Sequence, residues 1–189
     1  MLAWNKKPIK DNLPNQYKWL ADEPAPKILI EMLKLYGVTE VAGEADNPLI
    51  LEWVKELGDK VGTDYKNDSI PWCGLAMGVV AQRVGYDIPS ISVRASSWLK
   101  FGNPVFQPML GDIIITSREG GNHVSLYVGQ DKYGYFHSLG ANQRDQVNIS
   151  RIAMKRIIGI RRCKWKIKQP ENIRTIILDP VGFISENEA

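Results

Sequence analysis

The pattern of apolar residues changes once along the chain, between residues 102 and 111. Before this point, apolar residues recur with the spacing of amphipathic helices, and we expect helices over residues 26–36, 48–57, 71–84 and 95–101. After it, short β-branched runs separated by turn residues predict strands over residues 113–116, 123–129, 133–139, 147–149 and 157–165. Helices first and turn-linked strands second predict an α+β fold, with N-terminal helices packed on a small antiparallel sheet of about five to six strands.

The length of 189 residues fits one domain with short additions at its ends. We expect an N-terminal arm over residues 1–24, a folded domain over 25–168 and a C-terminal extension over 169–189 that packs on the surface. The net charge of +3 is too small to indicate nucleic-acid binding. We therefore expect no nucleic-acid partner. We also expect the protein to be a monomer.

The chain offers few signals for export. Its two cysteines cannot make a disulfide framework, so no oxidising compartment is implied. The first eight residues lack the apolar core of a signal peptide, and no run approaches the roughly 18 apolar residues that indicate a transmembrane helix. We expect synthesis in the cytoplasm without a signal peptide and no transmembrane segment.

Cys73 is the first candidate for chemistry, because it opens an expected helix. Considered alone, it is better explained as a small buried hydrophobe, because free cysteines are often simply buried. His123 begins an expected strand, and a nucleophile on a helix with its base on an adjoining sheet is the arrangement of papain-like enzymes. A helix start would favour the thiolate form and offer a backbone N–H to an oxyanion. Cys163 fits the apolar face of its strand, and its distance in sequence from Cys73 disfavours zinc, so we expect no metal and no cofactor.

Four short motifs carry a resemblance to a known family when taken in order. They are Trp72-Cys73, Gly111-Asp112-Ile113-Ile114, the run from His123 to Gly129, and Leu139-Gly140-Ala141-Asn142-Gln143. Over about residues 25–165 the chain resembles the CHAP and NlpC-type cysteine peptidoglycan hydrolases. It is most similar to a phage and bacterial branch in which a Gly-Val-x-Glu segment, here Gly37-Val38-Thr39-Glu40, precedes a Pro-Trp-Cys motif.

The resemblance implies Cys73 as nucleophile, His123 as general base and later acid, and a third residue that orients the histidine. Asn142 stands where CHAP members have an asparagine, and we favour it. Gly140 departs from the pattern, because many CHAP members have a glutamate there. The alternative is His137, because in NlpC-type members the third residue is commonly a histidine and His137 lies near that place. Both Asn142 and His137 can also be explained as structural residues.

The function implied by the resemblance is hydrolysis of an amide or peptide bond in bacterial peptidoglycan through a thioester. The enzyme would be an amidase or an endopeptidase, and a phage endolysin is one form that it could take. It would reach the wall after holin-type release or delivery by a virion or secretion machine. Two alternatives stay open. One is a non-enzymatic wall-binding or virion structural module with the same fold, and the other is a papain-like protease or acyltransferase with another substrate.

Three further features bear on a substrate surface. Trp72, Trp98 and Tyr127 would wall a substrate cleft or belong to the core. Asp68, which precedes Cys73, is a weak candidate to line a substrate groove. The basic residues around the last expected strand, where Arg162, Lys164, Lys166 and Lys168 alternate with apolar residues, indicate a solvated edge strand or a surface for an anionic partner.

Overall fold

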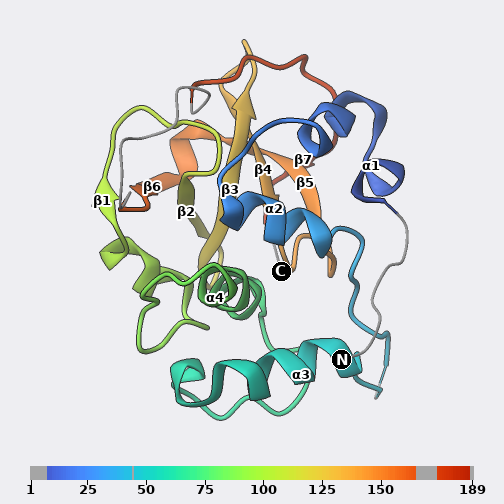
Figure 1. Cartoon of the computed structure of the whole chain (residues 1–189), viewed down its shortest axis with the longest axis vertical. Helices are drawn as coiled ribbons and strands as arrows, with labels where there is room; N and C mark the ends of the chain where they lie inside the picture. Colours follow the sequence, from blue (N-terminus) through green and yellow to red (C-terminus); the bar gives the residue numbers. More distant parts are fainter. Residues whose placement is uncertain (1–7, 44, 165–173, 188–189) are drawn as a thin grey trace.

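The structure, a computed structural model, describes residues 8–43, 45–164 and 174–187. A sheet forms its centre, with the strand order β1-β6-β2-β3-β4-β5-β7 (Figure 1). The strands are β1 (Asn103–Pro104), β2 (Ile113–Arg118), β3 (Gly121–Gln130), β4 (Tyr135–Gly140), β5 (Asn148–Ala153), β6 (Ile157–Arg162) and β7 (Ile184–Ser185). The α+β class is confirmed.

The sheet is larger than expected, and it is mixed. All five predicted strands are present as β2 to β6, and their pairs are antiparallel. The C-terminal strand β7 adds to β5 in parallel, which corrects the prediction of a purely antiparallel sheet. At the other edge, β1 pairs with β6, so the expected edge strand is covered. The strand predicted over residues 157–165 ends earlier, at Arg162, and residue 165 lies outside the described residues.

The α-helices precede the central strands in the chain. They are α1 (Ile9–Asn12), α2 (Lys27–Lys34), α3 (Pro48–Leu57) and α4 (Cys73–Arg83). The 3-10 turns are η1 (Asn15–Ala21), η2 (Gly58–Val61), η3 (Ala95–Lys100) and, between β5 and β6, η4 (Met154–Arg156). The three longer predicted helices are confirmed as α2, α3 and α4. Asn47 caps α3 as its sequence position predicts, accepting the Leu49 amide at 2.9 Å before Pro48.

Helix α4 is the centre of the helical layer. It packs against β3 on one side and against α2 and α3 on others, and α3 lies farther from the sheet (Figure 1). Every residue from Cys73 to Ala81 is buried, because the helix has neighbours on all sides. Trp72, Trp98 and Tyr127 are each 0% exposed, so the core interpretation holds for these aromatic residues.

The N-terminal arm contains more structure than its polar sequence indicates. Its described part forms α1 and η1, and Tyr17 and Leu20 of η1 are buried in the core. Within the part of the chain that the structure describes, no helix has the length and apolar character needed to cross a membrane.

Glycines on α4 let the segment after the helix approach closely. A Cβ at Gly74 would lie 2.2 Å from the carbonyl oxygen of Val93, and one at Gly78 would lie 2.9 Å from Ser92 Oγ. The two glycines are four residues apart and therefore lie on the same face of the helix. Residues 92–93 consequently run directly against the first turns of α4.

We expect Gly74→Ala to destabilise the protein by about 1–3 kcal/mol, because the added methyl group meets backbone that cannot easily move. In an uncrowded helix the same change would stabilise by about 1 kcal/mol. Chemical denaturation followed by circular dichroism measures the difference.

The matched control is Gly121→Ala, because a Cβ there has no atom within 4 Å. Equal stability of the Gly74→Ala protein and the wild type would contradict the close approach of residues 92–93.

Candidate active site

Cys73 is the first residue of α4 and is 4% exposed. The N-cap residue, Trp72, donates its indole N–H to Glu40 Oε1 at 2.6 Å, so its side chain is engaged away from the helix. The first helical hydrogen bond runs from the Ala76 amide to the Trp72 carbonyl. The thiol therefore lies in the first turn, where backbone amides and the helix dipole favour negative charge.

His123 lies near the start of β3, the strand against which α4 packs, and is 1% exposed. Its Nε2 atom is 3.2 Å from Oε1 of Gln143. An amide oxygen only accepts hydrogen bonds, so Nε2 carries the proton and Nδ1 has the lone pair in the neutral ring. This tautomer leaves Nδ1, which is also buried, as the basic atom of the histidine.

The orientation of the Gln143 amide follows from the oxygens around it. Its nitrogen donates to the Asn148 carbonyl at 2.8 Å and to Asn148 Oδ1 at 3.0 Å, with longer contacts to the carbonyls of Ser138 and Gly140. Turning the amide over would place its oxygen among these acceptors. Oε1 must therefore face His123, where it also accepts the Ser150 hydroxyl at 2.9 Å.

The hydrogen bond predicted for Asn142 is thus made by its neighbour Gln143. Asn142 has a left-handed φ of 55°, and its buried Oδ1 has no hydrogen-bond partner among the described residues. Gly140 provides the space, because a Cβ there would lie 3.0 Å from His123 Nε2 and 3.1 Å from Gln143 Oε1. The side chain of Gln143 therefore reaches His123 beside this glycine.

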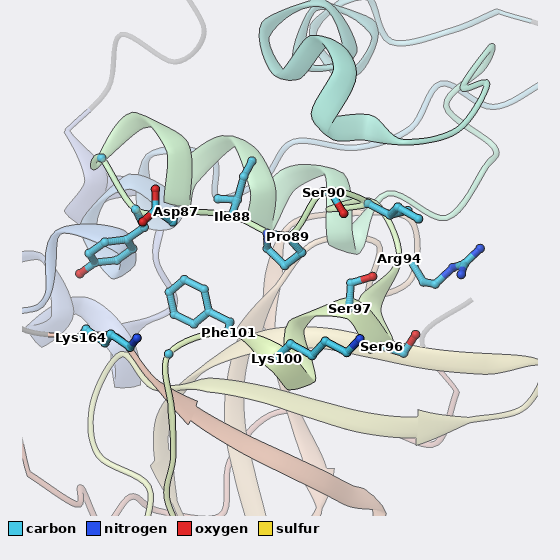
Figure 2. Close-up of a pocket in the computed structure, with 14 residues that line it drawn as sticks. Asp87, Ile88, Pro89, Ser90, Arg94, Ser96, Ser97, Lys100, Phe101 and Lys164 are labelled. Carbon is cyan, nitrogen blue, oxygen red and sulfur yellow. The ribbon is translucent and has the colours of Figure 1, made fainter.

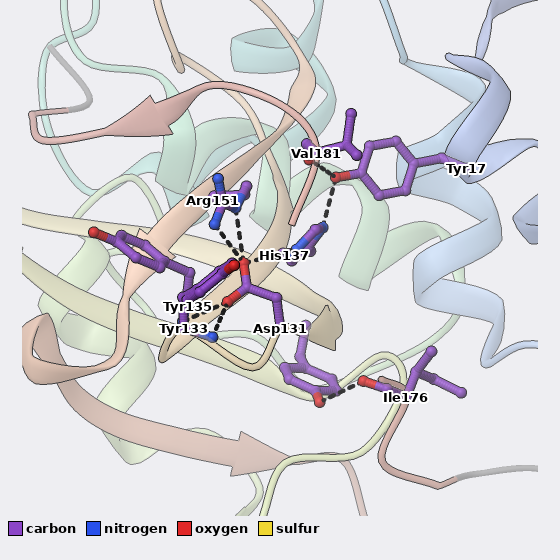
Figure 3. A network of polar contacts seen from close by, with 9 residues as sticks. Tyr17, Asp131, Tyr133, Tyr135, His137, Arg151, Ile176 and Val181 are labelled. Carbon is purple, nitrogen blue, oxygen red and sulfur yellow. Dashed lines mark hydrogen bonds and ion pairs between the residues drawn. The ribbon is translucent and has the colours of Figure 1, made fainter. Parts of the chain in front are cut away.

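His137, the alternative third residue, belongs to a different buried cluster (Figure 3). The Tyr17 hydroxyl lies 2.6 Å from its Nδ1, and Asp131 Oδ2 lies 3.4 Å from its Nε2. Asp131 also pairs with Arg151 at 2.7 Å and accepts the Tyr133 amide. His137 is 0% exposed and ties the arm, the β3–β4 turn and β5 together.

The Gly37-Val38-Thr39-Glu40 segment connects the two halves of the site. Its backbone pairs with the loop after Gln143, through hydrogen bonds from the Gly37 amide to the Val147 carbonyl and from the Glu40 amide to the Asp145 carbonyl. The Glu40 side chain accepts from Trp72, beside the nucleophile. Burial raises the pKa of Glu40, an effect that the Trp72 hydrogen bond opposes.

The loop before Cys73 is held by an acidic residue. Asp68 is 3% exposed and accepts the amides of Val41 and Asn47 at 3.1 and 2.7 Å, so it positions backbone and does not line a groove. The Tyr65 hydroxyl donates to the Ile70 carbonyl at 2.6 Å. Burial, together with the charges of Glu40, Asp68 and Cys73, raises the pKa of Tyr65, which keeps the phenol neutral and able to donate.

Two of the residues needed for this arrangement were not singled out from the sequence. The resemblance contains Gln143 and Glu40, but neither was assigned a role. Glutamine carries no titratable signal, and its contact with His123 depends on backbone turns that a pattern does not specify. The signal available for Glu40 was its place in the Gly-Val-x-Glu segment.

Cys163 is buried in the core, as expected, and burial raises the pKa of its thiol. In the described part of the chain, no group of three or more His, Cys, Asp or Glu side chains has a geometry that would hold a metal ion.

Comparison of the chain with models of known protein families found no match, and neither did a search of curated proteins.

We expect the neutral ring of His123 to carry its proton on Nε2, and Gln143→Leu to mix the two tautomers, because the only change at the ring is loss of the acceptor. Long-range ¹H–¹⁵N spectra distinguish the tautomers. Asn142→Gly is the control, since it removes the neighbouring amide and accommodates the positive φ. A tautomer shift in the glycine variant and none in the leucine variant would contradict the assignment.

His137 should make stability depend on pH. Burial lowers its pKa below the ordinary value of 6.5, although Asp131 opposes this. As the pH falls through about 6.5, the unfolded chain binds a proton that the folded protein does not, so the free energy of unfolding decreases. We expect this decrease to be smaller in His137→Gln, measured by urea denaturation from about pH 8 to about pH 5.

His123→Gln serves as the comparison, because it removes the other histidine and leaves the His137 cluster intact. If the free energy of unfolding has the same pH dependence in wild type and His137→Gln, then His137 titrates alike in the folded and unfolded states. That result would contradict the prediction.

Proposed function

We propose that the protein is a cysteine amidohydrolase with a papain-like arrangement, in which Cys73 is the nucleophile, His123 the general base and Gln143 the residue that orients the base. The hydrogen bond between His123 Nε2 and Gln143 Oε1 carries the proposal, because it leaves Nδ1 to accept a proton. Packing of α4 on β3 supports the pairing of Cys73 with His123. Asn142 is not needed for this role.

The reaction would begin with transfer of the thiol proton to His123 Nδ1. The thiolate attacks the carbonyl carbon of the scissile amide, and the Cys73 amide is the proposed donor to the resulting oxyanion. His123 returns the proton to the amine nitrogen as the C–N bond breaks, which leaves a thioester. Water, deprotonated by His123, then attacks the thioester and regenerates the thiol.

The substrate we propose is bacterial peptidoglycan, cleaved at an amide or peptide bond. The resemblance of the ordered motifs around Cys73, His123 and Gly140 supports this substrate. Two of the motifs also meet in the structure, because Glu40 of the Gly-Val-x-Glu segment accepts a hydrogen bond from Trp72. A phage endolysin is the setting we infer, with the protein made in the cytoplasm and reaching the wall by holin-type release or delivery in a virion.

We expect Cys73→Ala and His123→Gln each to lower the rate of wall cleavage by at least about 1,000-fold, because the two groups act as one unit. For the same reason the double variant should be about as slow as either single one. Clearing of purified cell walls gives the rate, and mass analysis of the released fragments identifies the bond.

Cys163→Ala is the matched thiol control and should keep activity, because Cys163 lies in the core away from the helix start. Wall clearing by Cys73→Ala at the wild-type rate would overturn the nucleophile. Intact walls after treatment with the wild-type protein, from all wall types tested, would overturn the substrate.

A further inference from the structure

A pocket of about 740 Å³ lies beside α4 (Figure 2). It is lined by residues between Gly85 and Gly102 together with Lys164, which follows β6. A volume of this size is typical of sites that bind small molecules. The proposed reaction uses none of the residues that line it.

The walls combine apolar and cationic groups. Ile88, Pro89 and the ring of Phe101 form apolar surface, and Lys100 and Lys164 lie on either side of Phe101 in Figure 2. The hydroxyls of Ser96 and Ser97 lie on the same side as Lys100. These groups suit a ligand that has short alkyl parts between anionic ones.

The cations of the pocket are not used by the fold. Within the described residues, no ion pair or hydrogen bond engages the side chains of Arg94, Lys100 or Lys164. Two other arginines, by contrast, form ion pairs: Arg83 with Glu56 and Arg162 with Asp112. Since the described pocket lining has only Asp87 as an acidic residue, its charge balance is positive.

One wall of the pocket runs along the helix that begins at Cys73. Residues 92–93, which connect the lining residues Ile91 and Arg94, run against α4 at Gly74, the residue after Cys73. Arg94 directly follows this contact, so it lies at the end of the wall that is next to the first turn of α4. A chain-like ligand in the pocket would therefore lie along the flank of the helix that carries Cys73.

We propose that this pocket binds a peptide with free carboxylates, and that it holds the peptide part of the substrate during cleavage. The identity of the ligand as a wall peptide rests on the proposed function. Arg94, Lys100 and Lys164 supply the charges for carboxylates, and Ile88, Pro89 and Phe101 supply contacts for alanine-like methyl groups. A phosphate polymer would use the cations but leave the apolar wall uncovered, so the peptide is the better match.

Binding is tested with the Cys73→Ala protein and a soluble disaccharide-peptide fragment of peptidoglycan, by calorimetry. We expect Arg94→Gln or Lys100→Gln to weaken binding about threefold to fivefold, and the double variant about tenfold. High salt should weaken binding of the Cys73→Ala protein as well. A fragment whose carboxylates are amidated should bind weakly to the Cys73→Ala protein. Its affinity should be about the same as that of the intact fragment for the double variant.

Lys155→Gln is the matched control, because it removes an exposed positive charge outside the pocket. Unchanged binding by Arg94→Gln and Lys100→Gln, or equal weakening by Lys155→Gln, would overturn the proposal. Tighter binding of a glycerol-phosphate polymer than of the peptide fragment would also overturn it. Thermal melting shows whether each variant is folded. Ser97→Asp adds an anion to the same wall and gives a second test, with the same expected loss of fragment binding.

The same variants in the active protein separate this inference from the proposed function. If walls are cleaved, the double variant should raise KM about tenfold and leave kcat nearly unchanged, because the pocket lies outside the reacting groups. Cleavage with an unchanged KM would overturn the pocket alone. If the peptide binds but the wild-type protein, which retains Cys73, cleaves no wall, the proposed function is overturned. The pocket then remains a peptide-binding site.

Discussion

The geometry of the site depends on one buried amide that can adopt a single orientation. Oxygens of Asn148, Ser138 and Gly140 surround the Gln143 nitrogen, and this fixes the oxygen toward His123. The neutral amide of Gln143 thereby assigns the proton of the imidazole to one nitrogen.

The loop that carries Gln143 is positioned by a segment far away in the sequence. Residues 37–40 pair with residues 145–147, and Glu40 reaches across to the indole of Trp72. Trp72, the residue beside Cys73, and the loop that contacts His123 therefore share one support. A shift of this segment would move both together, which preserves their relative placement better than two independent supports would.

The sequence predicts the large features because they have strong local signals. Helix α3 begins at an Asn-Pro pair and the central strands are β-branched runs, whereas β1 and β7 have two residues each and too few positions to show a pattern. Cys73 and His123 stand out because the chain has few cysteines and histidines. Gln143 could not be chosen over Asn142, because left-handed backbone at residues 142, 144 and 145 decides which side chain turns inward.

The cluster around His137 joins segments from both ends of the chain. Tyr17 comes from the arm, and its hydroxyl also lies 3.5 Å from the carbonyl of Val181; the Arg151 amide donates to the Phe183 carbonyl. The buried phenol of Tyr17 therefore has all of its partners only when residues 181–183 are in place against the arm. Removing this segment would take the Val181 carbonyl from the phenol and leave its contact with His137, so the two ends of the chain stabilise the same cluster.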